Sequence, residues 1–198
     1  MLFRHNRNLF HLLLFFTLLL TQSCTPVVIG ATAATVATLS SQEKSIGVII
    51  DDRSIWTKIK IALSKETLLK NVSISVSEGR VLITGKAKNS MERIKIAKIV
   101  WEQNGVREVM NETQVELHEP SFSKSAWITS YIKLMLLMKN SIKSFNYTIE
   151  TYDGTVYILG IAQSKEEMKK VYTIARKTKG VKQVVNYARL KNSLMRHM

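Results

Sequence analysis

Apolar residues recur with two different periods between residues 51 and 119, and these periods predict helices and strands. Residues 55–63 have apolar side chains at helical spacing, and Asp52 or Ser54 is a suitable N-cap for that helix. Residues 72–83 alternate between apolar and polar, and Glu78-Gly79 interrupts them as a tight turn, so a hairpin is expected. The core candidates are Ile55, Ile59, Ala62 and Leu63 in the helix and Val72, Ile74, Val76, Val81 and Ile83 in the hairpin.

A second helix and a third strand complete this unit. The helix begins at Asn89 or Ser90, and Asn104-Gly105 ends it because glycine adopts the left-handed conformation of a C-cap. The order helix-strand-strand-helix-strand predicts an α+β fold in which two helices pack on one face of a three-stranded mixed sheet. The apolar positions are Ile96, Ile99 and Val100 in the helix and Val106, Val109 and Val115 in the last strand.

The same unit occurs a second time in the chain. Residues 147–160 repeat the pattern of residues 72–85 at an offset of 75, and residues 132–136 repeat residues 59–63 at an offset of 73. We therefore expect two tandem αββαβ units, at residues 51–119 and 120–192, followed by a tail at 193–198. The glycines at matching places, which we expect to be structural turn residues, are Gly79, Gly85, Gly105, Gly154, Gly160 and Gly180.

The N-terminal residues have the pattern of a secretory signal. Arg4 and Arg7 precede a nine-residue apolar run at 12–20, and small or polar residues follow it. The run is shorter than the roughly 20 apolar residues that a spanning helix needs. Residues 1–23 are therefore interpreted as a signal peptide. A buried N-terminal helix is the alternative.

The only cysteine, Cys24, follows this segment directly and resembles the modified residue of a bacterial lipoprotein lipobox. Ser23 fits that motif, whereas Thr21 stands where the family prefers leucine. The resemblance implies that the Cys24 thiol receives diacylglycerol, that acyl chains such as palmitate anchor the chain, and that Thr25 directs it to the outer membrane. Residues 24–50 would then form a tether. An ordinary cleaved signal with an incidental cysteine is the alternative.

The two hairpins and the Gly-Val pairs after the second helices, Gly105-Val106 and Gly180-Val181, resemble the BON domain of bacteria. With the lipobox and the tether, the chain looks like the dual BON-domain lipoproteins of the Gram-negative outer membrane. Asp51-Asp52 and the segment 127–129 fit that family as well. The resemblance implies a protein facing the periplasm that binds phospholipid or tethers envelope components, supports membrane integrity and has no enzymatic activity.

Residue types for catalysis are sparse. After the signal, only His118 and His197 remain, and no nucleophile elbow or glycine-rich phosphate loop is present. One cysteine cannot build a Cys-based zinc site or an intramolecular disulfide. Glu166-Glu167 is expected in the first turn of a helix, where carboxylates favour the helix dipole. The sequence therefore predicts a protein without enzymatic activity, cofactor or metal.

Charge divides unevenly between the two units. The 198 residues carry a net charge of +14. Residues 51–119 contain 12 basic and 10 acidic residues, a net +2, whereas residues 120–198 contain 14 and 4, a net +10. Each basic residue near a charged leaflet contributes about 1 kcal/mol of attraction, so the second unit is expected to seek an anionic surface. Nucleic acid is not an expected partner, because a signal segment precedes the units and no recognition motif accompanies the charge.

The first helix of the second unit has a wider apolar arc than a core requires. Trp127, Tyr131, Leu134 and Met138 stand where the first unit has Ser54, Lys58, Ile61 and Lys65. Aromatic residues edged by lysines suit the bilayer interface, so these four residues, with Lys124 and Lys133, are the predicted site for anionic phospholipid.

Two other interpretations of this arc remain open: burial against the first unit, and a groove for a protein partner. The latter would make the protein an adaptor at outer-membrane assembly machinery. Trp56 and Trp101 are expected to pack locally within the first unit. The oligomeric state is not predicted.

Overall fold

The structure is a computed structural model that describes residues 46–115 and 121–191. All of these residues belong to one compact unit that extends from residue 38 to residue 198. Several of the expected features lie outside the described residues: the signal peptide, Cys24, most of the tether, His118, His197 and the tail.

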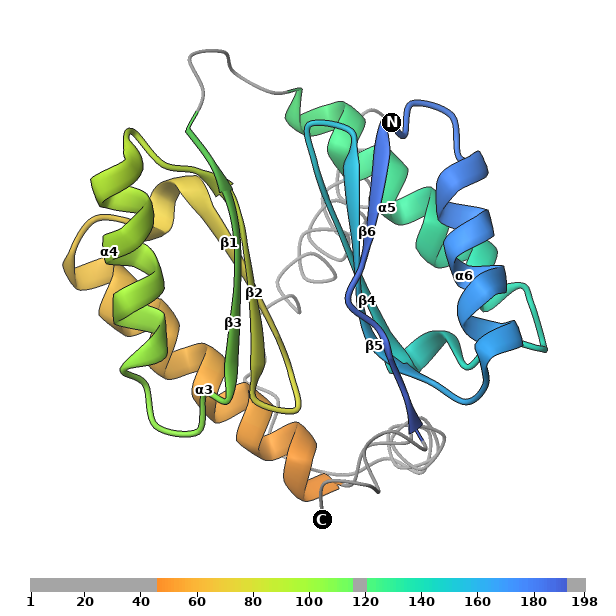
Figure 1. Cartoon of the computed structure of the whole chain (residues 1–198), viewed down its shortest axis with the longest axis horizontal. Coiled ribbons are helices and arrows are strands. Elements are labelled where there is room, and N and C mark those ends of the chain that lie inside the picture. Colours follow the sequence, from red (N-terminus) through yellow and green to blue (C-terminus); the bar gives the residue numbers. More distant parts are fainter. Residues whose placement is uncertain (1–45, 116–120, 192–198) are drawn as a thin grey trace, which may run out of the picture. The chain divides into compact units, whose positions relative to one another are not determined.

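The first repeat consists of two helices on one face of a three-stranded sheet (Figure 1). β1 (Val72–Ser77) is antiparallel to β2 (Arg80–Lys86), and β2 is parallel to β3 (Glu108–Gln114), so the sheet is mixed. Val81 lies opposite Val76 on one side and Val109 on the other. A single 3₁₀ turn, Leu69–Asn71, leads into β1. The elements are α3 (Ile46–Lys65), β1 (Val72–Ser77), β2 (Arg80–Lys86), α4 (Ser90–Trp101) and β3 (Glu108–Gln114).

The second repeat has the same order and the same strand directions. Val156 lies opposite Thr151 in the antiparallel neighbour and opposite Val184 in the parallel one. A two-residue strand, β7 (Arg189–Leu190), adds a parallel pairing with the end of β5 (Thr155–Ala162). The α+β fold of two tandem αββαβ units is thus confirmed. The elements are α5 (Phe122–Leu137), β4 (Tyr147–Tyr152), β5 (Thr155–Ala162), α6 (Lys165–Lys177) and β6 (Gln183–Asn186).

Each repeat buries its own apolar core between helices and sheet. Equivalent residues occupy equivalent places, because Ile59 and Ile132 are both fully buried on the first helix of their repeat. The sheet contributes Ile83 in one repeat and Ile158 in the other. Both cores are built from residues within the described ranges, and these belong to the compact unit that begins at residue 38.

Helix α3 begins earlier than the sequence suggested, and this corrects the expected N-cap. The helix starts at Ile46, so Asp52 and Ser54 lie inside it. Asp52 is buried, and its carboxylate accepts hydrogen bonds from the backbone N–H groups of Glu78 and Gly79, at 2.8 and 2.9 Å. Both turn residues have positive φ, 57° and 71°, as a two-residue hairpin turn requires. Asp52, predicted as an N-cap, therefore links α3 to the β1–β2 hairpin.

The second helix of each repeat has the expected polar start. The Asn89 side chain accepts a hydrogen bond from the N–H of Glu92, whose carboxylate accepts one from Lys88 N–H at 2.7 Å. In the second repeat the cap is Ser164, and the buried Glu167 carboxylate accepts from the N–H groups of Lys143 and Gln163. Both arrangements resemble a capping box, except that the carboxylate accepts from the residue before the N-cap and not from the N-cap itself.

Several local expectations for the first repeat need correction. Helix α4 ends at Trp101, so Gly105 lies in the following loop rather than at the C-cap. Val115 falls outside β3 and is exposed. Trp56 does pack locally, donating its indole N–H to the carbonyl of Ile74 at 3.1 Å, but Trp101 is 58% exposed.

The six repeated glycines all have positive φ, but they do not all lie in turns. Gly85 and Gly160 lie inside β2 and β5, where the neighbouring strand comes very close. A Cβ on Gly85 would lie 2.2 Å from the carbonyl oxygen of Asn71. At these two positions glycine is needed for close backbone approach.

The second faces of the two sheets bury a further apolar cluster. Leu82 and Met110 of the first repeat pack with Tyr157 and Leu159 of the second. Polar contacts surround the cluster: Ser75 donates to Glu150 at 2.9 Å, and Tyr187 donates to Glu112. The apolar contact between the two repeats is therefore made by the sheet faces.

A charged network closes one side of this contact. The buried Arg80 pairs with Glu108 at 2.8 Å and donates to the Tyr187 carbonyl at 2.9 Å, while Arg189 pairs with the same carboxylate at 2.6 Å. The hydrogen bond from Arg80 is the largest influence on Glu108, and with the charges of both arginines it holds the pKa of that carboxyl below its ordinary value of 4.5.

Replacing Asp52 by alanine should lower the free energy of unfolding by about 2 kcal/mol, because two backbone donors lose their acceptor and one of them is buried. Urea unfolding of the chain from residue 38 onward measures this. Asp51→Ala is the matched control, since Asp51 is exposed, and it should change stability by less than about 0.5 kcal/mol. Equal losses in the two variants would contradict the role given to Asp52.

Replacing Glu108 by glutamine should weaken the chain at neutral pH and much less in acid. A carboxyl with a depressed native pKa contributes stability above its ordinary pKa and loses it as the pH falls through the native value. The stability difference between wild type and Glu108→Gln should hold constant down to about pH 5 and shrink toward pH 3. Urea unfolding at a series of pH values tests this, and a difference that stayed constant to pH 3 would refute it.

Candidate functional site

The outer surface of α5 carries a row of exposed apolar side chains. Ile128, Ile132 and Leu136 point into the core. The other side of the same helix exposes what we call the α5 apolar face, composed of Trp127, Tyr131, Leu134 and Met138. The Trp127 side chain is 51% exposed, so burial of this face against the first repeat, one of the open interpretations, is wrong.

Two aromatic rings stiffen one end of this face. Trp127 and Tyr131 are one helical turn apart, and their rings stack at a centroid distance of 5.3 Å with an interplanar angle of 14°. Stacked aromatic pairs gain more stability than the burial of their surface area alone provides. The rings therefore form a preorganised apolar platform, each with a polar group that suits a wet boundary.

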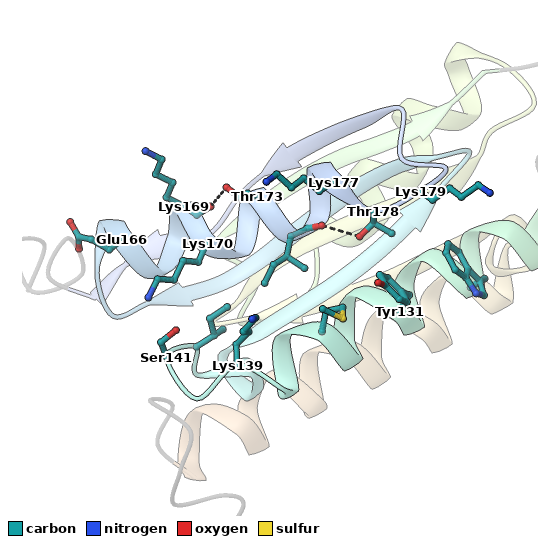
Figure 2. Close-up of a pocket in the computed structure, with 14 residues that line it drawn as sticks. Tyr131, Lys139, Ser141, Glu166, Lys169, Lys170, Thr173, Lys177, Thr178 and Lys179 are labelled. Atoms are coloured by element: carbon teal, nitrogen blue, oxygen red, sulfur yellow. Dashed lines mark hydrogen bonds between the residues drawn. The ribbon is translucent and has the colours of Figure 1, made fainter.

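A groove lies between α5 and α6, next to the α5 apolar face. Its volume is about 1010 Å³. Tyr131 borders it from α5 and Lys139 from the turn after α5, and Lys169, Lys170 and Lys177 come from α6 on the other side (Figure 2). The apolar side chains that line this α5–α6 groove are those of Trp127, Tyr131, Met135, Ile142 and Ile174.

The rim of the groove is strongly basic. Of the described residues that line it, Glu166 is the single acid. Its pKa is lowered, first by its own backbone N–H and then by the Ser164 side chain, with smaller contributions from the charges of Lys165 and Lys170. In Figure 2, Lys139 and Lys170 extend toward the space between the helices, whereas Lys169 extends away from it. The lysines that line the groove are Lys139, Lys169, Lys170, Lys177 and Lys179.

The six residues predicted from the sequence fall in different places. Trp127 and Tyr131 line the α5–α6 groove, and Lys124 lines a smaller pocket at the start of α5, which Trp127 also borders. Leu134 and Met138 are exposed but do not line the groove, and neither does Lys133.

The sequence reasoning missed several residues of the groove. Met135 stands at the position equivalent to the predicted core residue Ala62, yet it is half-buried and lines the groove together with Ile174. The concentration of lysines in α6 was visible in the sequence. What could not be read from it was that α6 packs beside the wide arc of α5.

The strongly perturbed ionisable groups lie elsewhere. Burial is the main cause that raises the pKa of Tyr157 to about 12, and burial followed by the charge of Glu167 raises the pKa of Tyr147 still further. Both tyrosines belong to strands and remain neutral at physiological pH. They fit a structural role better than that of a catalytic acid or base, which would need a pKa near the working pH.

The described part of the chain contains no group of three or more histidine, cysteine, aspartate or glutamate residues that could hold a metal ion. Among its helices, none combines the length and apolar content that crossing a bilayer requires. The arrangement can thus offer an apolar, lysine-rimmed surface to a ligand with an apolar part and a negative charge.

Comparison with known proteins identifies both repeats. The family model of the BON domain matches residues 51–116 and 124–192. An uncharacterized protein encoded in the gshII 5′ region of Anaplasma centrale is 41% identical over 150 residues, which cover 74% of this chain and 99% of that protein.

Two relatives carry descriptive names. Outer membrane lipoprotein DolP of Haemophilus influenzae is 29% identical, over 83% of this chain and 86% of its own length. Osmotically-inducible protein Y of Escherichia coli is 27% identical, over 75% of this chain and 77% of its own length.

Proposed function

The chain belongs to the BON-domain family, and we propose that it is an outer-membrane lipoprotein whose second BON unit binds anionic phospholipid and so supports the integrity of the envelope. It acts by binding and has no enzymatic activity. The observation that carries this proposal is the exposed, partly stacked α5 apolar face beside a groove rimmed by five lysines.

The proposed anchor is Cys24, with the two units facing the periplasm. Support comes from the signal-like residues 1–23, from the position of the only cysteine, and from the name of the Haemophilus relative, which is an outer membrane lipoprotein. Residues 25–45 would serve as the tether, shorter than the sequence suggested because α3 starts at Ile46.

The second contact with the membrane is the α5 apolar face. Removing a large apolar side chain from water gains about 1.5–3 kcal/mol when burial is complete. Trp127, Tyr131, Leu134 and Met138 are all at least 40% exposed, so each has apolar surface left to bury. An amphipathic helix inserts about 5–10 Å into the interface, a depth that side chains on one helix face can reach while the lysines stay at the headgroups.

The alternative function is that of a periplasmic adaptor for outer-membrane assembly machinery. A second exposed apolar row on α4, with Met91, Ile94 and Trp101, favours it, because the lipid proposal assigns no role to these residues. Vesicle binding that depends on the α5 apolar face and not on the α4 row would favour the lipid function over the adaptor function.

The double variant Trp127→Ala, Tyr131→Ala should bind phosphatidylglycerol-containing vesicles at least about tenfold more weakly than wild type. Co-sedimentation of the chain from residue 38 onward, which lacks Cys24, measures this. Trp101→Ala is the matched control, since Trp101 on α4 is also more than half exposed, and it should bind like wild type. Absence of wild-type binding, or equal losses in both variants, would refute the lipid proposal.

Exchanging Lys139 and Lys170 for glutamine should reduce both the preference for anionic over neutral vesicles and the salt dependence of binding. The reason is that roughly 1 kcal/mol of attraction is lost per charge. The control exchanges Lys58 and Lys65, which are exposed on α3. If the control pair weakened binding as much, the attraction would be a property of net charge and not of the groove rim.

A further inference from the structure

The hairpin turn of the first repeat holds a carboxylate. The two oxygens of Asp52 accept the N–H groups of the two turn residues, Glu78 and Gly79, one each. The site is built from backbone donors that the hairpin itself leaves unpaired, since the turn residues stand outside the β1–β2 pairing. Hydrogen bonds to a charged acceptor are about twice as strong as neutral ones.

The second repeat builds the same turn from Asp153 and Gly154, which also have positive φ, 44° and 77°. Its surroundings repeat as well. Lys182 N–H donates to the Gly154 carbonyl at 2.8 Å, as Arg107 N–H does to Gly79. At the offset of 73 that relates α3 to α5, the position of Asp52 is taken by Ser125. The second repeat therefore keeps the turn and lacks its carboxylate.

A pocket of about 540 Å³ opens at this place. Gly154 and Ser125 line it, and so do three lysines, Lys124, Lys179 and Lys182. Lys124 stands where the first repeat has Asp51, so the pair Asp-Asp has become Lys-Ser. The acid of the pocket, Asp153, pairs with Lys182 at 2.8 Å. Three lysines against one acid leave the pocket positive.

We propose that this pocket binds a phosphate-type oxyanion, which takes the place at the Asp153-Gly154 turn that the Asp52 carboxylate fills in the first repeat. A phosphate has several acceptor oxygens, so it can meet the turn amide of Gly154 and more than one lysine at once. This inference rests on the proposed function to the extent that the bound group is a lipid headgroup. Trp127 lines both this pocket and the α5–α6 groove, so a phosphodiester held here would have the apolar platform beside it.

The test installs the missing carboxylate. In Ser125→Asp the new carboxylate should accept the N–H groups of the turn and so block the phosphate site. The first repeat demonstrates that aspartate is compatible with this architecture. Ser130→Asp is the matched control, because it adds the same charge to an exposed position of α5 that lies outside this pocket. Thermal unfolding of both variants establishes that they are folded.

The first arm uses soluble phosphate. In ¹H–¹⁵N spectra of the chain from residue 38 onward, inorganic phosphate or glycerol phosphate should shift the Gly154 amide, while the Gly79 amide, already bonded to Asp52, stays in place. The shift should disappear in Ser125→Asp and persist in Ser130→Asp. A second arm compares the two variants on phosphatidylglycerol vesicles, where Ser125→Asp should bind about tenfold more weakly than Ser130→Asp.

The outcomes separate this inference from the proposed function. Loss in both arms, or in the vesicle arm alone, supports the pocket, and the second pattern assigns the phosphate to a lipid headgroup. Loss in the phosphate arm alone, with no wild-type binding to vesicles, supports a site for free phosphate and refutes the lipid proposal. If wild type binds vesicles, Ser125→Asp binds them like Ser130→Asp, and phosphate shifts no turn amide, the pocket is refuted while the lipid proposal stands.

Discussion

The structure depends on one constraint: a three-stranded sheet has two faces, and two helices cover only one of them. A unit of about 70 residues has no further element for the second face. In this chain the second faces cover each other, through Leu82 and Met110 on one side and Tyr157 and Leu159 on the other. Arg80 can be buried there because Glu108 and a backbone carbonyl receive its donors. This solution leaves the outer sides of the helices unused by the fold, and the candidate site is built from two of them.

Duplication gave the chain two scaffolds that share what folds them and differ in what they expose. Both keep the isoleucines of the first helix, the hairpin turns with positive φ and the polar start of the second helix. The copies diverge at other positions of the first helix: Trp127 and Tyr131 take the places of Ser54 and Lys58, and Lys124-Ser125 take those of Asp51-Asp52. The second repeat lacks the acid that braces the first hairpin and has lysines around the same turn. A stabilising contact in one repeat thus corresponds to a positive surface in the other.

The strands, the helices and their order could be predicted from the sequence because local periodicity and turn chemistry determine them. The failures were of another kind. Asp52 has the residue type of an N-cap, but its partners lie 26 and 27 residues away, and no local pattern reveals them. The sheet contact was missed because Ser75 and Arg80 alternate as solvent-facing residues do. In the site, Trp127 and Tyr131 were found because α5 alone places them, whereas Ile174 and Lys170 required the packing of a second helix.

Two attachments of unequal strength would divide the work at a membrane. In the proposed arrangement the acyl chains on Cys24 hold the protein in the bilayer, and stable anchoring takes at least two such signals. Tethering raises the effective concentration of the α5 apolar face at the surface, so even a weak contact becomes populated without any new interaction. A contact that is not needed for attachment is free to depend on lipid charge. The second unit can then bind where the membrane is anionic and dissociate where it is neutral. In this arrangement the lysine rim makes binding sensitive to lipid composition and does not serve as a second anchor.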